Sequence, residues 1–172
     1  MQKTIDLIYV TTGRHPTVEK IICEATNSKY SHAAIGIEIE GTYRIVEAVR
    51  PAVRIVPGNY FDNCTIKQVV SLPISEEQHR TVVEKVMELV GTEYGVDDCV
   101  VSGLHNLLGE QAAAIANRLL DNGDTIQCSG AQVEFIRAAF PDFAGDCPSN
   151  HFTPEQARQF AIDYAARLGV TV

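Results

Sequence analysis

The sequence predicts an α+β domain in which a small, mostly antiparallel sheet packs against helices. Three observations lead to this prediction. Alternating and β-favouring segments dominate residues 5–71, segments with apolar residues at helical spacing dominate residues 75–168, and no repeat or linker separates the two. The chain has 172 residues, of which 45% are hydrophobic and 21% charged, so we expect a single globular domain over residues 1–172.

The sheet is predicted from short β-favouring segments that lie between turn residues. Residues 33–49 alternate in hydrophobicity on both sides of Gly41 and Thr42, which predicts an antiparallel hairpin that turns at these two residues. The remaining strands are expected at residues 5–10, 53–56 and near 65–71.

The helices are predicted from apolar stripes and from their capping residues. Ser75 with Gln78, and Thr153 with Gln156, form Ser/Thr-x-x-Gln capping boxes at two helix starts. Gly91 is expected to end the first of these helices. The predicted helices cover residues 16–26, 76–90, 111–120, 128–140 and 154–168, and the ambiguous segment 96–108 is also taken as helical.

Charge and cysteine usage exclude several classes of protein. The formal net charge of −8, without a cluster of Lys and Arg, argues against a nucleic-acid partner. No apolar run is long enough to span a bilayer, and the first residues are typical of a strand and not of a signal peptide, so we expect a cytoplasmic protein. The five cysteines are scattered and form no Cys-x-x-Cys pair, so neither a metal site, another cofactor nor a disulfide framework is expected.

Cys128 is the first candidate site residue, because the pattern of "DTIQCSGAQVEFIRAAF" places it in the first turn of a helix. The unpaired amides and the helix dipole at such a position favour a thiolate and lower the pKa of a thiol. Ser129 and Gly130 are small and leave space beside the sulfur. The alternative interpretation is a buried structural cysteine, which is the usual environment of a free thiol.

His32 is the histidine that best fits a base for this cysteine. It begins a predicted strand and shares one strand face with Ala34 and Gly36, whose small size leaves room for a helix that carries Cys128. The other histidines lie in loops, on a polar helix face or in the ambiguous segment. The alternative interpretation is a histidine at a strand edge that has no part in a site.

Glu47 is the candidate partner of His32. It lies on one strand face with Ile45 and Val49, where a carboxylate is costly unless it is paired, and the hairpin places its strand beside that of His32. Such a carboxylate would orient the ring and stabilise its charged form. The alternatives are that this face is hydrated and that Glu47 is simply solvated. Four cationic residues are candidates either for binding an anionic group or for solvated surface: Arg14, His15, Arg50 and Arg54.

Four motifs together resemble a known superfamily. "GTEYG" and "IQCSGAQVEFIRAAF" resemble the Gly-x-x-Tyr-Gly and Cys-Ser-Gly signature of NlpC-type papain-like cysteine peptidases. "YSHAAIGIEI" resembles their histidine strand, and "YRIVEAVRPAVRIVPGNYF" resembles the segment with the third polar residue. The histidine segment precedes the cysteine here, as in the circularly permuted branch, which includes YiiX-like proteins and relatives of lecithin:retinol acyltransferase. The resemblance covers about Ile5 to Phe140.

The resemblance implies a permuted papain-like fold, with a small barrel-like antiparallel sheet against a helix whose N-terminus carries the nucleophile. It also implies the roles of four residues: Cys128 as the nucleophile, His32 as the general base, Glu47 as the third polar residue and Tyr94 as a hydroxyl that lines the site. The insertion between Tyr94 and Cys128 departs from the short spacing of unpermuted members.

The function expected from these residues is that of a cysteine hydrolase that cleaves an amide bond through a covalent acyl-enzyme. A small peptide, a peptidoglycan fragment or an acyl compound is the expected substrate, although the absence of an export signal makes a cell-wall substrate doubtful. The alternatives are an acyltransferase or thioesterase that acts on lipid or other acyl substrates, a binding module of the same fold without turnover, and an α+β domain with an unrelated role.

Overall fold

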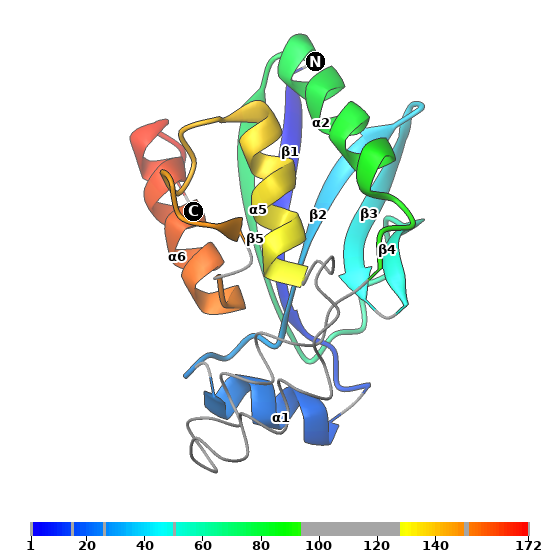
Figure 1. Ribbon diagram of the computed structural model, residues 1–172, viewed down its shortest axis with the longest axis vertical. Coiled ribbons are helices and arrows are strands. Elements are labelled where there is room, and N and C mark those ends of the chain that lie inside the picture. Colours follow the sequence, from blue (N-terminus) through cyan, green and yellow to red (C-terminus); the bar gives the residue numbers. More distant parts are fainter. Residues whose placement is uncertain are drawn as a thin grey trace.

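One antiparallel sheet of five strands, in the order β4-β3-β2-β1-β5, organises the protein (Figure 1). The computed structural model describes residues 2–14, 16–25, 27–49, 51–93, 128–149 and 152–171. In chain order the elements are β1 (Lys3–Thr11), α1 (Pro16–Ala25), β2 (His32–Ile39), β3 (Thr42–Val49), β4 (Ala52–Pro57), β5 (Ile66–Ile74), α2 (Glu76–Leu89), α5 (Cys128–Ala139) and α6 (Pro154–Arg167). The predicted α+β class is therefore confirmed.

The β2–β3 hairpin forms where the alternation predicted it, but its turn lies at Glu40 and Gly41 and not at Gly41 and Thr42. Both turn residues have a positive φ, 51° for Glu40 and 73° for Gly41. A two-residue type I′ turn requires this backbone conformation because its twist matches that of the flanking strands. Thr42 is then free to begin β3.

The two faces of the sheet have different cover. Alternate residues of β2, such as Ala33 and Ile35, belong to the main hydrophobic core, which α2, α5 and α6 complete on one face (Figure 1). Ala34 points to the opposite face, where a smaller cluster forms beneath Phe61. In chain order the smaller cluster consists of Ile8, Val10, Ala34, Ile45 and Phe61.

The prediction that the Cys128 helix packs over Ala34 and Gly36 was wrong, because α5 belongs to the core on the other face. The space beside Gly36 is filled by Tyr43, whose hydroxyl donates a 2.6 Å hydrogen bond to the Asp6 carboxylate. A Cβ atom at Gly36 would lie 1.9 Å from that hydroxyl oxygen. The glycine therefore admits a tyrosine from the neighbouring strand and not a helix.

The helices begin and end close to where the capping residues predicted. Both capping boxes are present, with Ser75 and Thr153 accepting hydrogen bonds from the backbone N–H groups of Gln78 and Gln156. β5 continues to Ile74, three residues beyond its predicted end. The helices expected at 96–108 and 111–120 lie outside the described residues. No helix in the described ranges is long and apolar enough to cross a membrane.

Candidate active site

Cys128 is the first residue of α5, as the sequence predicted, and its side chain is buried. Ser129 is also buried and its hydroxyl donates a hydrogen bond to the Phe152 carbonyl, so this small residue packs closely and leaves no open space. One turn further along, the Gln132 amide donates a 2.7 Å hydrogen bond to the Ala34 carbonyl in β2. These contacts fix the start of α5 against the strand that carries His32.

His32 and Glu47 face each other across neighbouring strands. The Nε2 atom of His32 lies 2.7 Å from the Oε2 atom of Glu47. The Glu47 side chain is only 2% exposed and that of His32 is 13% exposed. The predicted pairing of these two residues is therefore observed, and the interpretation of Glu47 as a solvated carboxylate on a hydrated face was wrong.

The second carboxylate oxygen of Glu47 is held by Arg54 in β4. The Nε and Nη2 atoms of Arg54 donate hydrogen bonds of 3.0 and 2.6 Å to Oε1, and Nη2 also lies 2.7 Å from the Tyr60 hydroxyl oxygen. The Arg54 side chain is 43% exposed. Each oxygen of the buried carboxylate thus accepts from a different cation-forming side chain.

The Cys128 sulfur lies where β2 and β3 separate. Their paired register ends at Ala34 and Glu47, although β2 extends to His32 and β3 extends to Val49. Beyond this last pair the Ala33 and Ser129 N–H groups are close enough to the Cys128 sulfur to lower the pKa of its thiol. The His32 ring lowers that pKa as well, through hydrogen bonding and through its charge. Because His32 Nε2 contacts Glu47, Nδ1 is the ring nitrogen left for the thiol.

The electrostatics of this group favour a thiolate beside a charged imidazolium. Burial disfavours charge on His32, but its hydrogen bonds with Cys128 and Glu47 outweigh burial and raise its pKa to about 10. Burial would raise the pKa of Cys128, but hydrogen bonding and the charge of His32 lower it below its usual range. Burial likewise opposes ionisation of Glu47, and the interactions with His32 and Arg54 lower the pKa of its carboxyl.

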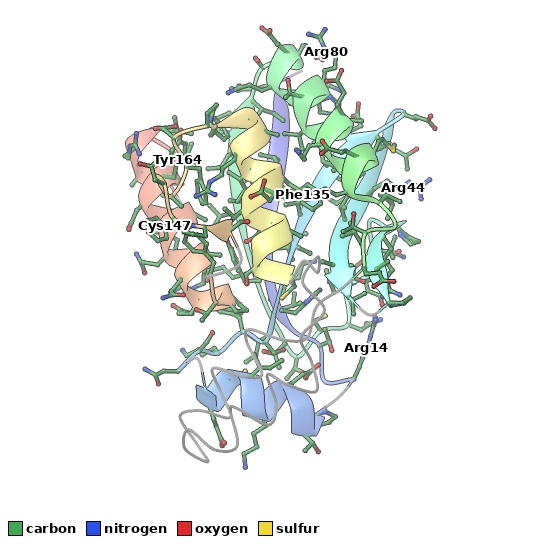
Figure 2. All side chains as sticks on the ribbon, in the orientation of Figure 1. Arg14, Arg44, Arg80, Phe135, Cys147 and Tyr164 are labelled. Carbon is green, nitrogen blue, oxygen red and sulfur yellow. The ribbon has the colours of Figure 1, made fainter. Side chains whose placement is uncertain are left out.

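The structure brings together three of the four residues expected from the sequence, Cys128, His32 and Glu47. Tyr94 lies outside the described residues, as do His15 and Arg50. Arg14 is exposed at the same end of the molecule as α1 (Figure 2), and its guanidinium lies 4.2 Å from the centre of the Tyr60 ring.

The role of Arg54 as the partner of Glu47 was missed by the sequence analysis. A signal was present, because Arg54 pairs directly with Glu47 in the β3–β4 register. Opposite charges at directly facing positions of an antiparallel pair stabilise each other, so a short turn between the two strands would have predicted this contact. Among the described residues, no cluster of three or more His, Cys, Asp or Glu side chains is arranged to hold a metal ion.

Comparison with solved structures shows that the chain has a known fold. The chain is similar to the crystal structure of the metalloprotein YiiX from Escherichia coli O157:H7, with a TM-score of 0.57 and 18% sequence identity. The similarity covers 81% of this chain and 67% of the YiiX chain. This is a YiiX-like fold. A scan against protein-family models and a search of curated proteins found no match.

Proposed function

We propose that this YiiX-like protein is a cysteine hydrolase that cleaves an amide bond in a small peptide or peptidoglycan fragment. The observation that carries the proposal is the continuous chain of contacts from Cys128 through His32 to Glu47, buried at a helix start. A nucleophile in contact with a base, and a base held by a third polar group, is the arrangement that covalent catalysis by thiols requires. The order of these residues along the chain supports placing it in the permuted NlpC-type papain-like branch.

In the proposed mechanism the Cys128 thiolate attacks the carbonyl carbon of the substrate and forms a carbon–sulfur bond. The carbonyl oxygen gains negative charge and is stabilised by backbone N–H groups at the start of α5. His32 then donates its Nδ1 proton to the leaving amine as the carbon–nitrogen bond breaks, which produces an acyl-enzyme. A water molecule, deprotonated by His32, attacks the acyl carbon and releases the acid and the thiolate. Glu47 acts as a positioning residue through the imidazole ring.

The same acyl-enzyme serves hydrolysis and transfer, and the experiment separates the two. The protein is incubated with panels of peptide amides, esters and thioesters, and its intact mass is measured with and without an added amine or alcohol acceptor. We expect the mass of one acyl group on Cys128 with the amide panel, and its loss to water. Release mainly to the acceptor would favour acyl transfer over hydrolysis.

Variants assign the acyl group to the proposed site. Cys128→Ala and His32→Ala are expected to abolish trapping and turnover, and the double variant should lose little more because the two groups act as a unit. Cys147→Ser and His79→Ala are matched controls, because Cys147 is exposed and His79 lies in α2, where its ring contacts the Glu38 carbonyl. Unchanged acylation in Cys128→Ala, or no acylation with any bond class, would overturn the proposal.

A further inference from the structure

A cleft lined by polar and charged residues lies at the same end of the sheet as Cys128, and the proposed mechanism does not use it. The cleft has a volume of about 380 Å³, which falls within the usual range for small-molecule sites. It lies between the loop that leads from α1 into β2, the start of β5 and the first turns of α6. We call it the Lys29 cleft, and its lining residues are Asn27, Lys29, Tyr30, Gln68, Glu155 and Arg158.

The walls of the Lys29 cleft are held by hydrogen bonds. Tyr30 donates a 2.8 Å hydrogen bond to the Gln68 side-chain oxygen, and Arg158 donates a second one of 3.3 Å to the same atom. Arg158 also binds both carboxylate oxygens of Glu155. The loop is fixed by a 2.6 Å hydrogen bond from the Thr11 hydroxyl to the Lys29 carbonyl. The cleft is therefore formed before any ligand arrives.

These contacts occupy the acceptors of the cleft and leave the Lys29 ammonium as an available donor. The Glu155 carboxylate and the Gln68 side-chain oxygen each accept from two or more donors. In contrast, no ion pair of Lys29 occurs within the described residues, and its ammonium is close enough to Glu155 to lower the pKa of that carboxyl. With two cations and one carboxylate, the lining carries a net charge of +1. A ligand that fits must supply anionic oxygen.

The register of the sheet gives the distance from the Lys29 cleft to the nucleophile. Gln68 pairs with Tyr9 in β1, and Tyr9 pairs in turn with Ala33 in β2, whose N–H contacts the Cys128 sulfur. Two strand spacings therefore separate the cleft from the site, which amounts to roughly 10–15 Å once side chains are included. Tyr9 and Ala33 are buried, so a ligand that reaches both places must pass along the outer ends of these strands, and an extended peptide of about three or four residues is the shortest that spans the distance.

We propose that the Lys29 cleft binds an anionic oxygen group, a carboxylate or a phosphate, on the substrate that Cys128 attacks. This inference rests on the proposed function and narrows its substrate to polar compounds that carry an anionic group three or four residues from the cleaved bond.

The test uses bromoacetyl reagents, which alkylate Cys128 as the carbon–sulfur bond forms and bromide leaves. Each reagent carries an arm, which is a chain of one to four glycines attached to the bromoacetyl group. The arm ends in a carboxylate, in the matching carboxamide or in a phosphate ester. We expect the longer carboxylate or phosphate arms to react about tenfold faster than the matched carboxamides, as one charge-assisted hydrogen bond predicts. The shortest arms should show no such preference. Comparison of the carboxylate and phosphate arms identifies the anion.

Lys29→Gln is the decisive variant, because the side chain is exposed and its removal leaves the core intact. It should abolish the preference for anionic arms and leave the rate with iodoacetamide unchanged. Arg80→Gln removes the same charge from α2 at the opposite end of the molecule (Figure 2) and should keep the preference. Two results would overturn this inference and leave the proposed function standing. One is a Lys29→Gln variant that prefers anionic reagents as strongly as the unmodified protein does. The other is an unmodified protein in which Cys128 reacts rapidly but shows no preference for anionic reagents. A Cys128 that titrates as a free thiol would overturn the proposed function instead.

Discussion

Glu47 is the residue on which the electrostatics of the site depend. Its two carboxylate oxygens accept separately from His32 and Arg54, and the side chain is 2% exposed. A buried carboxylate is stable only when its charge is paired and its lone pairs are satisfied. Here both conditions are met by residues on the two strands that flank β3. Glu47 thus connects an exposed guanidinium to the buried imidazole ring.

Replacement of Glu47 by glutamine removes the charge and keeps the shape. One amide position would then present N–H groups to His32 or Arg54, both of which already donate, so the free energy of unfolding should fall by about 1–3 kcal/mol. Loss of the negative charge lowers the pKa of His32, so the thiolate–imidazolium pair forms over a narrower pH range. We expect slower alkylation of Cys128 at mildly acidic pH in Glu47→Gln, measured as rate against pH.

The acid side of the stability curve gives a second readout of the same variant. In the folded protein the pKa of Glu47 is lowered from its ordinary value of 4.5. The ionised carboxylate therefore adds to the free energy of unfolding above pH 4.5, and this stabilisation is lost as the pH falls through the lowered pKa of the folded state. Glu47→Gln should therefore lose less stability on acidification than the unmodified protein. Glu84→Gln, in the exposed Arg80–Glu84 pair, is the matched control. Identical alkylation profiles for Glu47→Gln and the unmodified protein would remove Glu47 from the site.

At the scale of the elements, the β2–β3 hairpin is shaped by the contact of Tyr43 with Gly36. The tyrosine crosses the glycine and reaches Asp6 on β1, so three strands are connected on the face opposite α5. Gly36 is not in the left-handed region of φ, so its backbone conformation would accept an alanine. The nearest atoms that an alanine Cβ would meet all belong to the Tyr43 side chain. The glycine and the tyrosine therefore depend on each other.

Gly36→Ala should displace the Tyr43 ring and break its hydrogen bond with Asp6. We expect the free energy of unfolding to fall by about 1–3 kcal/mol, the usual cost of overpacking. The same substitution in a Tyr43→Ala background should cost markedly less, because the clash is absent. Chemical denaturation of the four proteins in this double-mutant cycle measures the coupling. Additive effects of the two substitutions would contradict the contact.

The same elements show what could be predicted from the sequence. The hairpin and the two capping boxes follow from local patterns, because alternation and capping involve residues only a few positions apart. The pairing of His32 with Glu47 followed from the hairpin together with the cost of burying a carboxylate. Alternation defines two faces of a strand but does not say which face a distant helix covers, so the position of α5 could not be predicted in this way.

At the scale of the whole molecule, the site joins two segments that are far apart in the sequence. The hairpin and β4 contribute His32, Glu47 and Arg54, whereas Cys128 comes from α5 in the core of the opposite face. Among the described cysteines, Cys128 has a lowered pKa, whereas burial raises the pKa of Cys23 and Cys64. The tertiary structure therefore distinguishes one thiol from the others.

Brief treatment with iodoacetamide at mildly acidic pH should label Cys128 at least about tenfold faster than Cys23 or Cys64, because only its thiolate is stabilised by a neighbouring imidazolium. Peptide mapping by mass spectrometry measures the labelling of each site. His32→Ala should remove the selectivity, since this ring lowers the pKa of Cys128 and is not among the causes that shift the pKa of Cys23 or Cys64. Even labelling across the cysteines of the unmodified protein would count against an activated Cys128.

The end of the β2–β3 pairing beside Cys128 has a consequence for how the protein is made. The hairpin has short-range contacts and forms early, but the nucleophile enters the gap between its strands only after the chain has been synthesised through α5. Until then Cys128 has no imidazolium or Ala33 amide beside it and is no more reactive than the other cysteines. The activation of Cys128 therefore requires tertiary structure, and an unfolded chain should show five cysteines of ordinary reactivity.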